Sequence, residues 1–124
     1  MSTATSSQGP SVFRFAGEVT PFATGHRVFS AGDPGDLMYA VREGEVELIV
    51  QDEVVEVVGP GGIFGEMALI DKQPRSATAI CRTDCLLIPI NENRFKFLVQ
   101  QTPFFAIEVM RLLARRLRQM DARA

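Results

Sequence analysis

A chain of 124 residues with a formal net charge of -2 is long enough for one domain and has no general excess of positive charge. Such a domain buries roughly two-thirds of its unfolded surface in a single core. Apolar residues make up 46% and charged residues 23% of the chain, which argues against a disordered chain or a membrane protein. Since 13 Lys and Arg face 15 Asp and Glu, no basic field would hold nucleic acid, and no nucleic-acid partner is expected.

Residues 1–11 (MSTATSSQGPS) are predicted to form a flexible tail, because they are mostly small, polar and uncharged. They have neither the basic start nor the apolar stretch of a secretory signal. No later run reaches the roughly eighteen apolar residues that a membrane span needs. We therefore expect a cytoplasmic protein without a membrane partner, whose one domain occupies residues 12–124.

The region from residue 12 to about residue 90 is predicted to form a β-barrel. Segments rich in Val, Ile, Phe and Leu are interrupted by Gly, Pro or Asp at intervals of roughly eight to twelve residues, as in β-sandwiches and barrels. In GEVELIVQ, Val46, Leu48 and Val50 alternate with glutamates, which predicts one buried and one exposed face. The segment VVEVVGPGG follows after QDE alone, so the two segments should form a hairpin.

Two further turns are predicted within the barrel. HRVFSAGDPGD ends a strand in a turn where Gly32 and Gly35 should supply positive φ values and Pro34 fixes one dihedral. SATAICRTDCLLIPI is typical of two strands joined near Thr83 and Asp84. These segments complete the barrel before the sequence period changes.

Two helices are predicted over residues 91 to about 120. Asn91 can cap the first, and Thr102 can cap the second, which then begins at Pro103. The second helix carries an apolar stripe with a spacing of three and four residues: Ala106, Met110, Leu113, Leu117 and Met120. This stripe either packs on the barrel or forms the seam of a homodimer, and both alternatives can hold for different turns.

The segment FGEMALIDKQPRSATA, residues 64–79, combines side chains suited to an anion and to a sugar. Gly65 permits close approach to a ligand, and the next residues can form one helical turn with free N–H groups. Arg75 offers a planar fork of donors, Ser76 adds a hydroxyl, and an ionised Glu66 could accept from a ribose hydroxyl. The alternative is a structural ion pair between Glu66 and Arg75 across a surface loop.

Residues 64–79 resemble the phosphate-binding cassette of the cyclic-nucleotide-binding domain family, which includes catabolite-activator-type regulators, regulatory subunits of cyclic-AMP-dependent kinase and cyclic-nucleotide-gated channels. The cassette runs Phe-Gly-Glu, two or three small or apolar residues, a spacer, then Arg, a small residue, Ala, and Thr or Ser. The matching residues are Phe64, Gly65, Glu66, Met67, Ala68, Leu69, Pro74, Arg75, Ser76, Ala77 and Thr78. AGDPGDLMYAVREGEVEL resembles the family's other glycine-marked stretch, and the resemblance covers residues 25 to about 118.

The resemblance implies a mainly β fold: a cyclic-nucleotide-binding β-roll or jelly-roll barrel with a short cassette helix and two C-terminal helices. It implies that Arg75 holds the cyclic phosphate and Glu66 the ribose 2′-hydroxyl. An arginine of the last helix could close the site. The ligand-binding residues that it predicts are Phe64, Gly65, Glu66, Met67, Ala68, Arg75, Ser76 and Ala77, with Val55 and Val57, on the inward face of their strand, as an apolar wall for the base. The closing candidates are Arg115, Arg116 and Arg118.

The implied function is that of a non-catalytic sensor that binds cyclic AMP, or alternatively cyclic GMP, and changes the position of its C-terminal helices. No enzyme, metal or cofactor is expected, because His26 is the single histidine and Cys81 and Cys85 have no nearby histidine in the sequence. A catabolite-activator-type DNA-binding regulator without its helix-turn-helix is one alternative. Another is a barrel of this fold that binds a protein partner, and an unknown protein effector is compatible with the main interpretation too.

Overall fold

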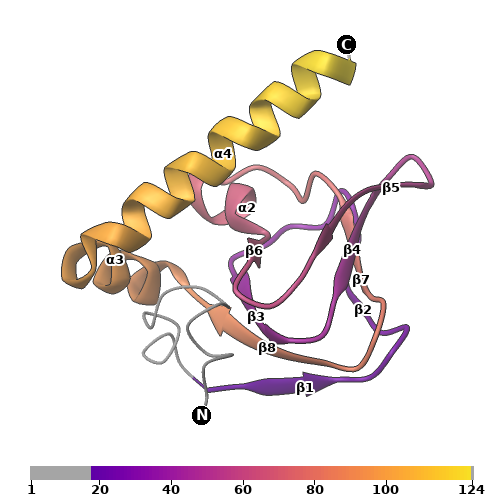
Figure 1. Ribbon diagram of the computed structural model, residues 1–124, viewed down its shortest axis with the longest axis horizontal. Helices are drawn as coiled ribbons and strands as arrows, with labels where there is room; N and C mark the ends of the chain where they lie inside the picture. Colours follow the sequence, from indigo (N-terminus) through magenta and orange to yellow (C-terminus); the bar gives the residue numbers. More distant parts are fainter. Residues whose placement is uncertain (1–17, 124) are drawn as a thin grey trace.

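The computed structural model describes residues 18–123, so the tail predicted for residues 1–11 lies outside the described part of the chain. Within it, the strands form a roll and three helices lie against one side of that roll (Figure 1). The elements are β1 (Thr20–Phe22), β2 (Arg27–Phe29), β3 (Met38–Glu43), β4 (Val46–Val50), β5 (Glu53–Val58), β6 (Ile63–Phe64), α2 (Glu66–Asp71), β7 (Thr78–Cys81), β8 (Cys85–Ile90), α3 (Glu92–Gln101) and α4 (Pro103–Arg123).

The strands form two antiparallel four-stranded sheets, in the orders β1-β8-β3-β6 and β2-β7-β4-β5. A cluster of buried side chains from both sheets fills the space between them, and Phe64 and Leu87 are fully buried in it. The β4–β5 hairpin and the turn between β7 and β8 lie where the sequence predicted them. The predicted fold class, a mainly β roll with a cassette helix and two C-terminal helices, is confirmed.

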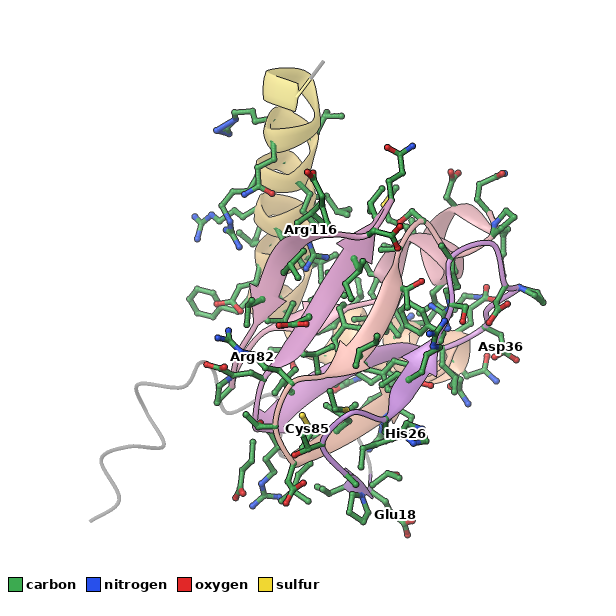
Figure 2. All side chains as sticks on the ribbon, turned by 90° about the vertical axis from the view of Figure 1, so that its right-hand side faces the viewer. Glu18, His26, Asp36, Arg82, Cys85 and Arg116 are labelled. Carbon is green, nitrogen blue, oxygen red and sulfur yellow. The ribbon has the colours of Figure 1, made fainter. Side chains whose placement is uncertain are left out.

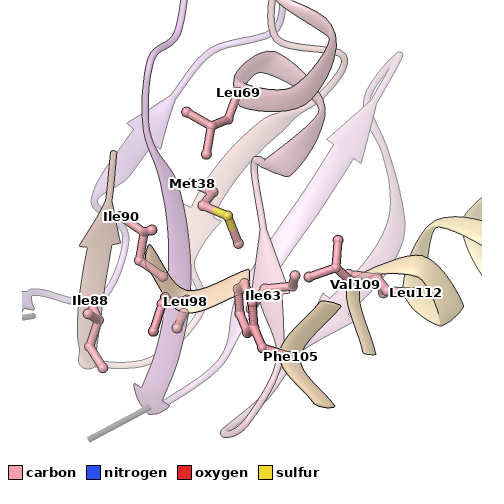
Figure 3. Close-up of a cluster of buried hydrophobic side chains, with 10 residues drawn as sticks. Met38, Ile63, Leu69, Ile88, Ile90, Leu98, Phe105, Val109 and Leu112 are labelled. Atoms are coloured by element: carbon pink, nitrogen blue, oxygen red, sulfur yellow. The ribbon is translucent and has the colours of Figure 1, made fainter. Parts of the chain in front are cut away.

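A second core cluster lies between the first sheet and the helices (Figure 3). Met38 and Ala40 of β3 belong to this cluster, whereas the alternate residues Tyr39 and Val41 belong to the cluster between the sheets. Because successive strand residues point to opposite faces, β3 is buried on both sides. Each large apolar side chain buried here contributes about 1.5–3 kcal/mol. The helices are therefore part of the domain core.

The face of α4 that packs on the barrel differs from the predicted stripe. Phe105, Val109 and Leu112 are buried, whereas Met110 is 56% and Leu117 is 60% exposed. Of the predicted stripe, Leu113 packs at the margin of the core, and the side chain of Met120 lies outside the described residues. The buried residues recur at intervals of four and three, like the predicted stripe, but each lies one position earlier in the chain. The helix therefore has two apolar series with the same spacing, and the sequence could not tell which one is buried.

The predicted cap at Asn91 and the predicted helix start at Pro103 are confirmed, whereas a cap by the Thr102 side chain stays a prediction. The side chain of Asn91 accepts a hydrogen bond from the amide of Arg94 at 2.8 Å, which caps α3. α4 begins at Pro103, and the carbonyl of Thr102 accepts from the amide of Phe105 at 2.9 Å. None of the helices in residues 18–123 is long and apolar enough to cross a membrane.

Both cysteines are free and buried. Burial, followed by the hydrogen bond with Cys85 and its charge, raises the pKa of the Cys81 thiol to about 12. Such a thiol stays protonated at neutral pH and is a poor nucleophile. Cys85 lies at the lower end of the barrel, well separated from Arg116 (Figure 2).

Candidate functional site

The cassette turn is built around Gly65, between β6 and α2. Gly65 has a φ of +80°, in the left-handed region that favours glycine. A Cβ at this position would lie 2.9 Å from Nη1 of Arg75 and 3.2 Å from the ring of Phe29. Glycine is thus required by both the conformation and the close approach of Arg75. Helix α2 ends at Lys72, which also has a positive φ, +59°.

Arg75 is held at the cassette by its backbone and its side chain. Its amide donates to the carbonyl of Asp33 at 2.8 Å, and its carbonyl accepts from the amide of Gly32 at 2.8 Å. The residue is only 7% exposed. Its Nη1 donates to the Gly65 carbonyl at 3.0 Å, and its Cζ lies 4.0 Å from the centroid of the Phe29 ring.

The charges of Asp36, Asp33 and Glu66 act on Arg75, but none of these carboxylates forms an ion pair with it. Within residues 18–123 it forms no ion pair with a carboxylate, and its buried Nε has no hydrogen-bond partner. Burial lowers the pKa of Arg75, while the charges of Tyr39 and Asp36 act in the opposite direction. Because a guanidinium titrates far above neutral pH, it remains a cation with an unused buried donor.

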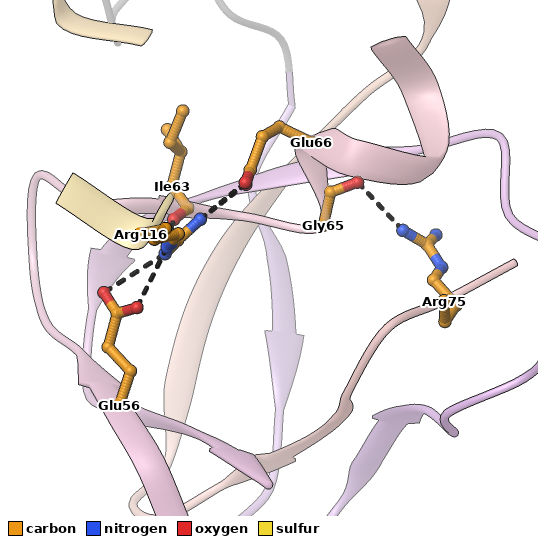
Figure 4. A network of polar contacts seen from close by, with 6 residues as sticks. All are labelled: Glu56, Ile63, Gly65, Glu66, Arg75 and Arg116. Carbon is orange, nitrogen blue, oxygen red and sulfur yellow. Dashed lines mark hydrogen bonds and ion pairs between the residues drawn. The ribbon is translucent and has the colours of Figure 1, made fainter. Parts of the chain in front are cut away.

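Glu66, the first residue of α2, is buried on the opposite side of Gly65 (Figure 4). It is 1% exposed, and both of its carboxylate oxygens lie 2.7 Å from Nη1 of Arg116. A surface ion pair between Glu66 and Arg75 was the structural alternative suggested by the sequence. That alternative is wrong, because both side chains are buried and Glu66 pairs with Arg116 instead.

Arg116 brings α4 to the cassette. Besides Glu66 it contacts Glu56 of β5, with Nε to Oε1 at 2.9 Å and Nη2 to Oε2 at 3.2 Å, and it donates to the Ile63 carbonyl at 3.0 Å (Figure 4). Burial alone lowers the pKa of Arg116, but the hydrogen bonds and charges of both glutamates outweigh it and raise that pKa overall. One guanidinium thus ties α4, β5, β6 and α2 together.

The sequence offered Arg115, Arg116 and Arg118 as residues that could close the site. Arg115 and Arg118 are exposed, and Arg116 is the one that reaches the cassette. The run of Phe105, Val109 and Leu112 continues to position 116 at helical spacing, so the phase of the buried face would have selected Arg116. The sequence did not predict which face of α4 is buried.

The two valines proposed as an apolar wall do not share one orientation. Val55 is half-buried against the inter-sheet core. Val57 pairs with Glu47 and is 39% exposed, so its predicted inward orientation is wrong. The inward residue beside it is Glu56, which pairs with the buried Leu48. A contact of either valine with a base stays a prediction.

The other predicted site residues differ in exposure. Phe64 is 0% exposed and stacks on Tyr39, with ring centroids 5.3 Å apart. Ala68 is buried, Ala77 is half-buried, and Met67 and Ser76 are exposed. Their backbone amides follow the cassette turn, but their roles toward a ligand stay predictions.

Gly35 has a role that its sequence context did not suggest. The turn before β3 was predicted to need positive φ at Gly32 and Gly35, and only Gly32, at +89°, adopts it. A Cβ on Gly35 would instead lie 2.2 Å from Nε and 2.4 Å from Cζ of Arg75. Gly35 therefore makes room for the guanidinium. Nothing in a single sequence connects positions 35 and 75.

The arrangement is a turn with two chemically different ends. On one side, Arg75 presents a buried cationic donor that no protein acceptor uses. On the other, Glu66 presents a buried carboxylate whose oxygens can accept further hydrogen bonds. Such a pair suits a ligand that carries an anionic group and a hydroxyl a short distance apart.

The model of the cyclic nucleotide-binding domain family matches residues 19–102, so the chain belongs to that family. The cyclic AMP receptor protein of Thermus thermophilus is 35% identical over 105 residues, which are 81% of this chain and 49% of the relative. The crystal structure of the Thermus thermophilus catabolite activator protein is 31% identical in sequence and superposes with a TM-score of 0.78. The match covers 92% of this chain and 57% of the activator chain.

A further solved structure comes from a cyclic-GMP-dependent signalling pathway that regulates bacterial phytopathogenesis. It is 28% identical, covers 94% of this chain and 94% of its own, and has a TM-score of 0.73. By contrast, the chain spans about half the length of the curated relatives it matches. The chain therefore resembles both longer relatives and a solved chain that it covers almost completely.

Proposed function

We propose that this domain is a non-catalytic regulatory module that binds a cyclic nucleotide at the cassette, cyclic AMP in the first place. The observation that carries the proposal is Arg75, a buried guanidinium with an unpaired Nε and no carboxylate partner among residues 18–123. A cyclic phosphate carries one negative charge and exocyclic oxygens that accept hydrogen bonds. Arg75 meets both requirements, and a buried charge-assisted hydrogen bond of this kind is among the strong ones.

The ribose would lie at the other end of the turn. Each oxygen of the Glu66 carboxylate accepts from Arg116 and keeps lone-pair capacity for another donor. A ribose 2′-hydroxyl can use that capacity without displacing Arg116. The amides of residues 66–68, Ser76 and Ala77 would complete the phosphate cradle. The carboxylates nearest this end, Glu56 and Glu66, are already paired with Arg116, which supports a site that uses no metal or further cofactor.

Cyclic AMP and cyclic GMP are distinguished by a direct binding experiment. The relatives include a cyclic AMP receptor protein and a structure from a cyclic-GMP-dependent pathway, and Ser76 follows Arg75 directly. Calorimetric titration with cyclic AMP, cyclic GMP and, as a control, linear 5′-AMP should give saturable binding, tightest for cyclic AMP and weakest for 5′-AMP. Equal affinity for 5′-AMP, or no binding of either cyclic nucleotide, would remove the support for the proposal.

We propose that the signal leaves the domain through α3 and α4. Arg116 joins α4 to Glu66 directly, so a ligand that engages Glu66 acts on a contact of α4. The shift can be no larger than the difference in ligand affinity between the two helix arrangements. A protein effector in the cytoplasm would then recognise the new position. The alternative, a DNA-binding regulator of the catabolite-activator type, draws support from the same relatives and would require DNA binding that weakens steeply with salt.

Saturating cyclic AMP should change amide hydrogen exchange in residues 92–123 by at least about threefold, which corresponds to roughly 0.6 kcal/mol of local opening free energy. Exchange in the β7–β8 turn, which leads into Cys85, serves as the control, because Cys85 lies far from Arg116, the residue that joins α4 to the cassette (Figure 2). If ligand changed exchange in the cassette alone, binding would stand and the proposed helix response would not.

A second copy of the chain is the proposed partner of the outer face of α4. Ile107, Met110, Ala114 and Leu117 are all exposed and follow one another at intervals of three, four and three residues. That spacing is the heptad seam of a coiled coil. The buried face of the same helix is separate, so packing on the barrel and pairing with a second copy are compatible.

Leu117→Glu should weaken self-association by about tenfold or more, because one buried leucine contributes about 1.5–3 kcal/mol. Sedimentation velocity over a concentration series measures the change. Arg115→Glu is the matched control, since Arg115 is exposed and, one residue after Ala114, takes an outer position of the heptad. Wild-type protein that sediments as a monomer throughout, or equal weakening by both variants, would contradict the seam.

A further inference from the structure

The guanidinium of Arg75 lies against an aromatic side chain, Phe29, that is not part of the cassette motif. Its Cζ is 4.0 Å from the centroid of the Phe29 ring at the end of β2. Gly35 lies so near the same guanidinium that a Cβ would be 2.2 Å from Nε and 2.7 Å from Nη2. Phe29 and Gly35 thus border the space that the guanidinium occupies, and we call this space the arginine slot.

The wall of the arginine slot is held in place by the core. The Phe29 ring contacts Phe64, with centroids 5.9 Å apart, and Tyr39, with centroids 6.2 Å apart. Phe64 and Tyr39 in turn stack on each other and are buried between the sheets. Because its ring contacts aromatic neighbours on two other strands, β3 and β6, Phe29 has little room to rotate away.

This contact has two physical effects on Arg75. A planar cation over a ring face is stabilised by the ring quadrupole, which offsets part of the loss of water around the buried charge. The ring accepts no conventional hydrogen bond, so the contact leaves Nε without an acceptor. The guanidinium is therefore fixed in position while its buried Nε keeps a donor that no protein acceptor uses.

We propose that Phe29 is a positioning residue for anion binding: it holds the Arg75 guanidinium in the arginine slot before the ligand arrives, and Gly35 keeps the slot open. Because the ordering of a long side chain is completed in the free protein, less entropy is lost on binding. The proposal rests on the proposed binding of a cyclic phosphate by Arg75, and it adds the residue that prepares Arg75 for that role.

The first test needs no ligand. A nucleus above an aromatic face experiences an upfield ring-current shift, so the Nε–Hε proton of Arg75 should resonate upfield of the other arginines in a nitrogen-correlated NMR spectrum. The Arg75→Lys spectrum, from which this signal is missing, assigns it. Phe29→Leu should move the signal toward the ordinary range, and Phe29→Tyr, which keeps a ring, should not. An unshifted Arg75 signal in the wild-type protein, or a signal that Phe29→Leu does not move, would contradict the contact between Arg75 and Phe29.

The second test measures ligand binding by the full chain. Phe29→Leu should weaken cyclic AMP binding by about 3- to 30-fold, the range that a partly buried cation–π contact represents, and Phe29→Tyr should retain most of the affinity. In an Arg75→Ala background, titrated by NMR so that millimolar constants are measurable, Phe29→Leu should add almost no further loss. Phe29 would then act through Arg75, since independent sites would show additive losses.

The two tests separate this proposal from the proposed function. Wild-type protein that binds neither cyclic AMP nor cyclic GMP contradicts the proposed function, and with it the positioning role, while the NMR signal still decides whether the slot exists. Wild-type protein that binds, with a Phe29→Leu loss of the same size in both backgrounds, overturns the positioning role alone. Melting temperatures of each variant, taken in parallel, show whether Phe29→Leu also perturbs the fold.

Discussion

Arg75→Ala should weaken cyclic AMP binding by about 2–5 kcal/mol, a factor of roughly 30 to 5,000 in the dissociation constant. The reason is that the phosphate would enter a buried site whose one adjacent cation is gone. Calorimetry measures the loss directly. The effect should be large because Arg75 forms no ion pair with a carboxylate in the part of the chain that the structure describes, and its buried Nε has no acceptor.

Two further variants make this prediction specific. Arg75→Lys should recover part of the affinity, since it keeps the charge but not the planar fork. Arg82→Ala is the matched control and should leave binding unchanged, because Arg82 is an exposed arginine at the edge of the barrel, where it pairs with Glu45 and Glu47 (Figure 2). Wild-type affinity in Arg75→Ala would show that the cassette is not the phosphate site.

Arg116→Ala should destabilise the domain by about 3 kcal/mol, within the range found when one partner of a buried ion pair is removed. The Glu66 side chain is 2% exposed and would be left as a buried carboxylate without its cation. The C-terminal half of α4 would also lose its polar attachment to β5 and β6. Urea denaturation at neutral pH measures the change.

Arg115→Ala is the control for this prediction, because Arg115 is the exposed neighbour on the same helix. It should change the free energy of unfolding by no more than about 0.5 kcal/mol, as is usual for surface substitutions. Adding Glu66→Gln to Arg116→Ala should restore part of the lost stability, since the unpaired charge is then removed. Equal stability of Arg115→Ala and Arg116→Ala would contradict the buried network.

The features that sequence reasoning predicted are those fixed by local chemistry. Strand alternation, the short hairpin after Val50, the cap at Asn91 and the helix start at Pro103 each depend on residues close in the chain. The cassette was accessible for the same reason, because its turn glycine, acid and arginine all lie within residues 64–79. Resemblance to the family then gave these residues their expected roles.

The features that were missed depend on contacts between distant segments. A register irregularity in the β4–β5 hairpin between Leu48 and Ile49 changes which residues of β5 face inward, so alternation placed Val57 on the wrong face. Helix α4 has apolar residues on two faces, and its sequence cannot say which one the barrel covers. The contacts of Arg75 with Phe29 and Gly35 join residues 40 or more positions apart.

The crystal structure of the protein with cyclic AMP most directly tests whether Arg75 and Glu66, at the two ends of one turn, bind the phosphate and the ribose of one nucleotide. We expect an exocyclic phosphate oxygen within hydrogen-bond distance of Nε of Arg75, and the ribose 2′-hydroxyl on the Glu66 carboxylate. A nucleotide bound elsewhere on the barrel, or a phosphate in the cassette that leaves Arg75 Nε unpaired, would contradict it.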